Sequence, residues 1–270
     1  MLYENINLNI GKAALTVYKP DGPKYNEAIL VIPGGGYGTI CRDREGEPIA
    51  LAYAARGFTA FVLEYSVGGD AADGQPIIEA SYAMSYIREN AVKYEINPNS
   101  VYAVGFSAGG HLAASLAVLW QRDDIIRRSG IKRGSNRPNA AALCYPVITA
   151  FEKAHKPSFY NIIGSSSPTN EQLEYYSIEK HVDKLSSPAF IMHTANDKLV
   201  PVENSLYLAQ SYACAGVPFE LHVYPDAPHG LALANELTSC GNPDFIRPQA
   251  ARWLDDSIAF FRSLPRPEAL

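Results

Sequence analysis

The stretch that decides the fold runs Val101-Tyr102-Ala103-Val104-Gly105-Phe106-Ser107-Ala108-Gly109-Gly110-His111-Leu112. It begins as an apolar, β-branched run, passes through Gly-x-Ser-x-Gly, and continues into Leu112, Leu116 and Leu119 at helical spacing. Strand, tight turn and helix are the context in which this motif predicts a nucleophile elbow, with Ser107 as the nucleophile. The flanking glycines leave room for a strained turn, and the helix start favours a developing negative charge.

A second glycine-rich segment precedes the elbow. Residues 28–32 form an apolar run that predicts a buried strand, and Pro33-Gly34-Gly35-Gly36-Tyr37-Gly38 follows it. One interpretation is a flexible loop. The more specific one is half of an oxyanion hole, because such a loop lets main-chain N–H groups approach a ligand closely. On that hypothesis, the N–H groups of Gly35 and Gly36 would join that of Ala108.

Strand and helix patterns alternate along the chain. This order predicts a mostly parallel sheet with helices on both faces, and together with the elbow it indicates a single α/β-hydrolase domain over residues 1–270. Strands are expected over 28–32, 58–65, 101–106, 140–145, 188–193 and 219–224, an edge hairpin over 2–10 and 13–18, and helices over 47–56, 76–94, 202–215 and 249–261. The charged residues 121–137 are interpreted as a solvated helix end and loop.

The alternation breaks over residues 149–184, which predicts a small cap insertion near the site. Its aromatic side chains are candidate pocket walls, although packing of the cap onto the body explains any one of them equally well. They are Phe151, Phe159, Tyr160, Tyr175 and Tyr176.

A serine hydroxyl needs a base within hydrogen-bond reach, and the base needs an acidic partner to orient it. His229 is the candidate base, because it lies between Pro228 and Gly230 in a loop after the last predicted strand, at the sheet edge where ligands bind. The other histidines are expected to pack or cap within helices, strands and the cap: His111, His155, His181, His193 and His222.

Two aspartates compete for the acidic position. Asp197 directly follows the predicted strand over 188–193 and precedes His229 by a strand–helix–strand unit, which matches the chain order serine, acid, histidine. Asp226 is the rival, only three residues from His229, but it is better placed to cap its own turn. We therefore expect Asp197 to orient His229 and to stabilise the imidazolium that forms when Ser107 attacks.

Composition excludes several classes of function. The net charge of −5 supplies no basic patch for nucleic acid, and no apolar run reaches the length of about 18 residues of a membrane span. Residues 1–5 lack the features of a signal peptide, and the four cysteines are scattered without a CxxC pair. These features predict a cytoplasmic protein with free thiols, no metal and no cofactor. The sequence does not distinguish a monomer from a homo-oligomer.

Four motifs together resemble one family. They are Pro33-Gly34-Gly35-Gly36-Tyr37, the elbow, His193-Thr194-Ala195-Asn196-Asp197 with Val200-Pro201, and Pro228-His229-Gly230. Over residues 10–262 the chain resembles the bifunctional feruloyl/acetyl-xylan esterase-like α/β-hydrolases, a group with many short intracellular bacterial carbohydrate acetyl esterases. Pro33 departs from the histidine that opens the related His-Gly-Gly-Gly loop of hormone-sensitive-lipase-like esterases. Because of that departure, the substrate specificity of those lipid esterases is not carried over directly to this chain.

The resemblance implies a serine carboxylesterase that removes short acyl groups, chiefly acetyl, from acylated sugars or oligosaccharides. A small carbohydrate ester is then the expected partner, with no nucleic acid and no membrane. One rival is a small peptidase of the prolyl-oligopeptidase type, which shares the elbow and triad. Another is a non-catalytic ligand-binding homologue, against which the intact Ser107, Asp197 and His229 argue, because binding alone needs no nucleophile.

Overall fold

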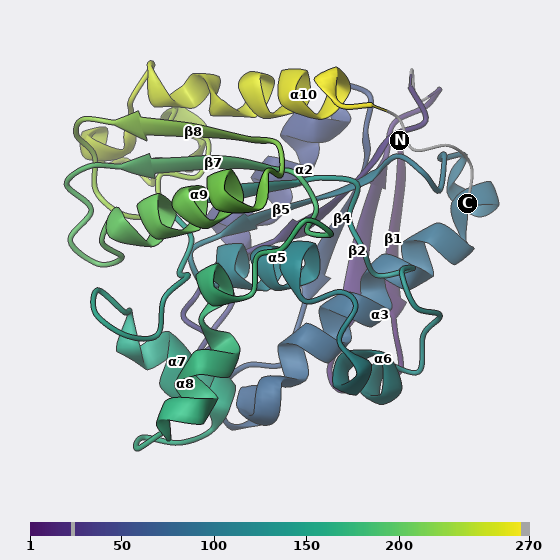
Figure 1. The fold of residues 1–270 in the computed structure, drawn as a ribbon. Coiled ribbons are helices and arrows are strands. Elements are labelled where there is room, and N and C mark those ends of the chain that lie inside the picture. Colours follow the sequence, from purple (N-terminus) through teal and green to yellow (C-terminus); the bar gives the residue numbers. More distant parts are fainter. Residues whose placement is uncertain (23–24, 266–270) are drawn as a thin grey trace.

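A computed structural model describes residues 1–22 and 25–265, and an eight-stranded sheet forms its centre (Figure 1). The strand order is β1-β2-β4-β3-β5-β6-β7-β8. The strands are β1 (Leu2–Asn7), β2 (Ala14–Lys19), β3 (Ala28–Ile32), β4 (Thr59–Glu64), β5 (Val101–Phe106), β6 (Ala141–Cys144), β7 (Ala189–Thr194) and β8 (Phe219–Tyr224).

The first two strands form the predicted antiparallel hairpin, and β2 continues antiparallel onto β4. Every other pairing in this sheet is parallel. Every residue of β3, β5, β6 and β7 is buried, as expected for parallel strands covered on both faces. The α/β-hydrolase fold predicted from the sequence is confirmed.

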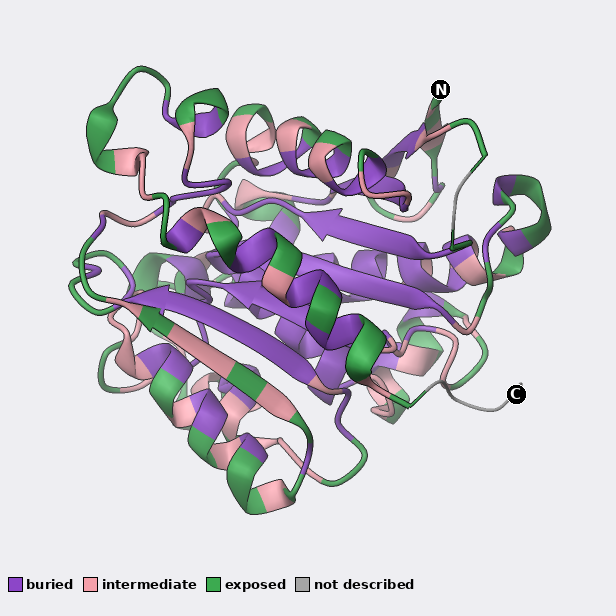
Figure 2. Ribbon diagram, turned by 90° about the horizontal axis from the view of Figure 1, so that it is seen from above, coloured by how far each residue is buried: buried purple, intermediate pink, exposed green. Residues whose placement is uncertain are grey.

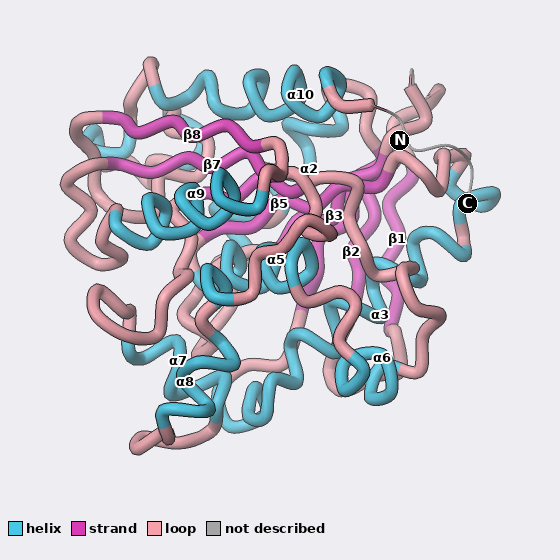
Figure 3. Tube along the Cα trace, in the orientation of Figure 1, coloured by secondary structure: helices cyan, strands magenta, loops and turns pink. Residues whose placement is uncertain are grey.

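Helices cover both faces of the sheet (Figures 1 and 3). Helices α2 and α10 pack on one face, and α3, α5 and α9 on the other. The α-helices are α1 (Arg42–Glu45), α2 (Glu47–Ala54), α3 (Gln75–Glu89), α4 (Ala91–Tyr94), α5 (Ala108–Val118), α6 (Asp123–Ser129), α7 (Lys156–Ile163), α8 (Asn170–Tyr176), α9 (Glu203–Ala215) and α10 (Trp253–Ser263). Short 3₁₀ helices are η1 (Gly68–Gly74), η2 (Ile178–Lys180), η3 (Glu236–Thr238), η4 (Pro243–Phe245) and η5 (Ala250–Arg252).

Two predictions about helices need correction, and one helix had not been predicted. The helix expected over 76–94 is interrupted at Asn90, which ends α3 and begins α4 with φ −100° and ψ 20°. Part of the charged segment 121–137 forms α6, which ends at Gly130 in a left-handed conformation. The four-residue α1 was not expected, because one helical turn is too short to show a hydrophobic period.

Two hydrophobic cores lie on the two faces of the sheet. Figure 2 shows buried residues along the central strands, with exposed residues on the outer helices and loops. The core beneath α2 and α10 is rich in aromatic side chains: Tyr53 packs edge-on against Phe58 and Trp253, and Tyr102 stacks on Phe261. These contacts pack α2 and α10 onto this face of the sheet.

Residues 149–184 contain α7, α8 and η2, and they lie below the sheet in Figure 1. Three of the aromatic residues proposed as pocket walls pack this segment onto the body. Phe159 is buried against the ring of His111, the main-chain carbonyl of Tyr176 accepts a hydrogen bond from His111, and Tyr175 lies under the guanidinium of Arg122. Of the other two, Phe151 is half-buried, like Tyr175, and Tyr160 is exposed.

Candidate active site

The elbow between β5 and α5 has the strained geometry that the motif predicts. Ser107 adopts φ 54° and ψ −118°, a backbone conformation that a non-glycine residue rarely adopts. A Cβ on Gly105 would lie 2.1 Å from the carbonyl oxygen of Gly109, and one on Gly109 would lie 2.2 Å from that of Ile32. The chain can therefore turn this sharply only with glycine at both positions.

The three residues selected from the sequence meet at the carboxyl edge of the sheet. His229 Nε2 lies 2.8 Å from Ser107 Oγ, and His229 Nδ1 lies 2.6 Å from Asp197 Oδ2. A carboxylate beside Nδ1 places the proton of a neutral imidazole there, so Nε2 accepts the Ser107 hydroxyl proton. This is the arrangement by which a base and its orienting acid activate a serine.

Asp197 sits in a turn that stabilises its ionised form. Its Oδ1 accepts hydrogen bonds from the N–H groups of Leu199 at 2.9 Å and Val200 at 3.0 Å. Burial alone would raise the pKa of this carboxyl, but hydrogen bonds from His193 and His229 outweigh that effect. The pKa of Asp197 therefore lies well below its ordinary value, and the side chain stays charged at neutral pH.

The rival aspartate lies outside this arrangement. Asp226 is exposed and accepts a hydrogen bond from the Asn196 side chain, and Arg247 approaches it at 4.0 Å. Its side chain therefore links the loop after β8 to the loop after β7, and does not cap its own turn as the spacing had suggested. His193, expected to be a core histidine, is fully buried and bonds to Ser205 Oγ at 2.7 Å and to the carbonyl of Val200 at 2.9 Å.

The glycine loop after β3 lies beside the elbow. A Cβ on Gly34 would approach the Cβ of Ser107 to 3.0 Å, and Gly35 and Gly36 have φ values of 127° and 64°. Between described residues, no hydrogen bond engages the N–H of Gly35 or Gly36. Ala108 begins α5, so its N–H has no acceptor within the helix. The predicted donors are thus available for an oxyanion, where one donor typically contributes about 3 kcal/mol.

A buried carboxylate beneath this loop was missed by sequence reasoning. Glu45 Oε2 accepts the N–H of Gly34 at 2.8 Å, and Oε1 accepts the hydroxyl of Tyr145 at 2.8 Å. Burial raises the pKa of Glu45, while these bonds and the charges of His229 and Arg44 oppose the rise. The sequence gives no local signal for this burial, because Glu45 ends a run of four charged residues over 42–45, a pattern typical of an exposed segment.

The position of His155, directly before α7, could not be predicted from the sequence either. Its Nδ1 lies 2.8 Å from Ser158 Oγ, and its Cε1 would be 3.7 Å from a Cβ on Gly36. Burial and the proximity of His229 lower its pKa. Asn161, two turns along the same helix, donates to the carbonyl of Gly36 at 2.9 Å. Helix α7 therefore lies against the glycine loop.

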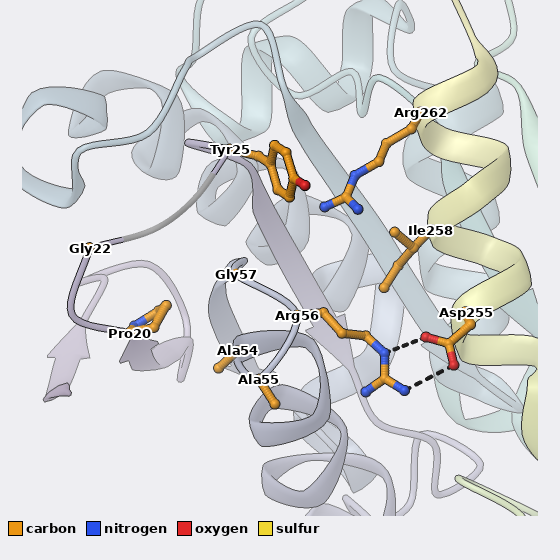
Figure 4. A pocket seen from close by; sticks show the side chains of 10 residues that line it. All are labelled: Pro20, Gly22, Tyr25, Ala54, Ala55, Arg56, Gly57, Asp255, Ile258 and Arg262. Atoms are coloured by element: carbon orange, nitrogen blue, oxygen red, sulfur yellow. Dashed lines mark hydrogen bonds and ion pairs between the residues drawn. The ribbon is translucent and has the colours of Figure 1, made fainter.

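A surface pocket lies at the opposite edge of the sheet, between the end of α2 and α10 (Figure 4). Gly57, at its rim, precedes β4, whereas Ser107 follows β5, so the pocket is remote from the elbow. Arg56 in this pocket is already paired with Asp255.

Within residues 1–22 and 25–265 no group of three or more His, Cys, Asp or Glu side chains could hold a metal ion. In the same part of the chain, no helix has the length and apolar character needed to cross a bilayer.

The fold and the Ser107–His229–Asp197 arrangement define an α/β-hydrolase with a site of the serine-hydrolase type. Comparison with known families identifies the group. The family model described as BD-FAE matches residues 15–212, and the chain belongs to this family of bifunctional feruloyl/acetyl xylan esterases. The resemblance seen in the motifs is confirmed.

Individual relatives agree with this assignment. The chain is 40% identical to endo-1,4-beta-xylanase B of Butyrivibrio fibrisolvens over 215 residues, which are 78% of this chain and 33% of the relative. It is 32% identical to an acetylxylan esterase of Xylanibacter ruminicola over 96% of this chain and 50% of that protein. The chain thus spans a third to a half of these curated relatives. A crystal structure of an acetyl ester-xyloside bifunctional hydrolase from Caldicellulosiruptor lactoaceticus superposes with a TM-score of 0.82 at 33% identity, covering 96% of each chain.

Proposed function

We propose that this chain is a serine carboxylesterase that removes short acyl groups, chiefly acetyl, from acylated sugars or oligosaccharides in the cytoplasm. The observation that carries the proposal is the unbroken hydrogen-bonded series from Ser107 Oγ through His229 to Asp197. Family membership narrows the chemistry to carboxylic esters. The printed names of an acetylxylan esterase and an acetyl ester-xyloside hydrolase support a sugar acetate as substrate.

In the proposed mechanism, Ser107 Oγ attacks the ester carbonyl carbon while His229 Nε2 takes the hydroxyl proton. The N–H groups of Gly35, Gly36 and Ala108 stabilise the negative charge that develops on the carbonyl oxygen. His229 then passes its proton to the departing sugar hydroxyl, which leaves an acyl-serine. Water attacks this acyl-serine by the same sequence of proton transfers, releasing the short acid and restoring Ser107.

The test compares the parent protein with Ser107→Ala and with Ser85→Ala, a matched control at a buried serine of α3. Substrates are p-nitrophenyl acetate, butyrate and octanoate, acetylated xylo-oligosaccharides, and aminoacyl p-nitroanilides. We expect turnover of acetyl esters by the parent and the control, and none by Ser107→Ala. A rate that rises steadily with acyl length would contradict the short-acyl specificity, because it indicates an open apolar groove that gains about 0.8 kcal/mol per methylene. Faster cleavage of the anilides would favour the peptidase alternative.

A further inference from the structure

Two loops that carry the proposed reaction meet at one buried side chain. The glycine loop follows β3, and the loop carrying His229 follows β8. Glu45 is 5% exposed and lies beneath both loops. Its Oε1 would be 4.0 Å from a Cβ on Gly230, the residue after His229. Burying a carboxyl group costs free energy unless both of its oxygens accept hydrogen bonds. The partners of the two Glu45 oxygens therefore show which segments this side chain holds in place.

The contact with the glycine loop is direct. The N–H of Gly34 points down to Glu45 Oε2 at 2.8 Å. The N–H groups of Gly35 and Gly36, the next two residues, have no acceptor among the residues that the structure describes. The N–H groups of Gly38 and Thr39 hold the turn itself by donating to the carbonyl of Gly35, and the bond to Glu45 adds an anchor one residue before the proposed oxyanion donors.

The contact with the histidine loop runs through Tyr145. Its hydroxyl donates to Glu45 Oε1 at 2.8 Å and accepts from the N–H of Ala232 at 2.9 Å. Its ring lies edge-on to the imidazole of His229, with centroids 4.9 Å apart. The neighbouring Arg44 donates to the carbonyl of Gly230. Helix α1 therefore contacts the histidine loop directly through Arg44 and indirectly through Glu45 and Tyr145.

From this geometry we infer that Glu45 is a positioning residue for the esterase reaction, holding the oxyanion donors and His229 in register with one another through Gly34 and Tyr145. The inference rests on the proposed function. A carboxylate offers an acceptor to each partner, whereas the isosteric amide of glutamine offers one acceptor and one donor. Glutamine keeps the size of the side chain, but it can accept from Gly34 only if its amide donates to the hydroxyl of Tyr145, which already accepts from the N–H of Ala232. Replacing Glu45 by glutamine therefore weakens the connection to Tyr145 or the one to Gly34.

The experiment measures the second-order rate at which a fluorophosphonate labels Ser107, because that reaction needs the activated serine and the oxyanion donors but no particular substrate. Four variants are compared with the parent: Glu45→Gln, Tyr145→Phe, their double variant, and Glu27→Gln. Glu27 is a matched control, a buried carboxylate paired with Arg262 before β3, at the opposite edge of the sheet. Steady-state kinetics with p-nitrophenyl acetate are recorded on the same preparations.

We expect Glu45→Gln to label at least about tenfold more slowly, since misplacing oxyanion donors is worth up to 10²–10³-fold. The loss in hydrolysis should fall on kcat, with KM changed less than about threefold, because the contacts act on the transition state. Tyr145→Phe should show a smaller loss of the same kind without removing a charge. The double variant should be no slower than Glu45→Gln by more than about threefold, because both changes cut the same connection.

Three results would overturn the inference: labelling of Glu45→Gln within about twofold of the parent, an equal loss in Glu27→Gln, or multiplication of the two single effects in the double variant. A parent protein that is labelled but hydrolyses no ester would refute the proposed function alone, since the labelling rates still report the positioning.

Discussion

The buried histidine of α5 should make the stability of this protein depend on pH. His111 is fully buried; its Nε2 donates to the carbonyl of Tyr176 at 2.8 Å and its Nδ1 accepts from the hydroxyl of Tyr37 at 2.8 Å. The protonated ring would carry two N–H donors, and the one on Nδ1 would face a hydroxyl that now donates to it. Burial accordingly lowers the pKa of His111 from 6.5 to about 4.

The sign and size of the effect follow from this pKa. Because the pKa is lower in the folded state than in the unfolded chain, the folded state binds fewer protons between pH 6.5 and 4. Stability that is fully present above pH 6.5 is lost as the pH falls through that window. The expected loss from His111 is about 1.4 kcal/mol at pH 5.5 and about 2.5 kcal/mol at pH 4.5.

The assay compares the parent with His111→Gln, whose amide can still donate to Tyr176 and accept from Tyr37 but does not titrate. Urea unfolding at pH 7.5, 5.5 and 4.5 gives the free energy of unfolding of each protein. Buried carboxyls such as Glu45 and Glu179, whose pKa values are raised by burial, titrate in both proteins and cancel in the difference.

The free energy of unfolding of the parent minus that of His111→Gln should fall by about 2.5 kcal/mol between pH 7.5 and pH 4.5. His181→Gln, at a surface histidine, controls for the loss of a histidine as such. A difference between parent and His111→Gln that stays within about 0.5 kcal/mol across the three pH values would refute the reasoning.

Three further outcomes test the site and the core. Asp197→Asn should lower kcat by about 10⁴-fold, as the equivalent change does in a serine protease, while Asp226→Asn stays within a few-fold; the reverse ranking would move the acid to Asp226. Gly109→Ala should yield little soluble protein, because its Cβ would lie 2.2 Å from a carbonyl oxygen of β3, and normal expression with full activity would contradict that geometry. Tyr53→Phe removes a 3.0 Å bond to Ser257 between α2 and α10 and should reduce the free energy of unfolding by about 1 kcal/mol, measured by urea.

The sequence sufficed to predict the sheet, the elbow and the grouping of Ser107, Asp197 and His229, because each depends on a local pattern at the end of a strand. Glu45 could not be found in this way. Its partner Tyr145 is 100 residues away, and nothing near Glu45 in the sequence indicates that its carboxyl is buried. The position of His155 depends on how α7 packs against the glycine loop, which is likewise a tertiary effect. Local patterns thus identify the candidate reacting groups, whereas the groups that hold them in place can be identified only from the folded chain.

The long sequence separations within the site have a consequence for when the proposed activity can arise during folding. Ser107 and His229 are 122 residues apart in the chain, and the bond from Arg44 to Gly230 spans 186. Parallel strands with such separations pair slowly, because long loops must close before their contacts form. A growing chain that has passed the elbow but not β8 carries a serine without its base. The proposed ester hydrolysis therefore requires the completed fold, and during refolding it should return only after the secondary structure has formed.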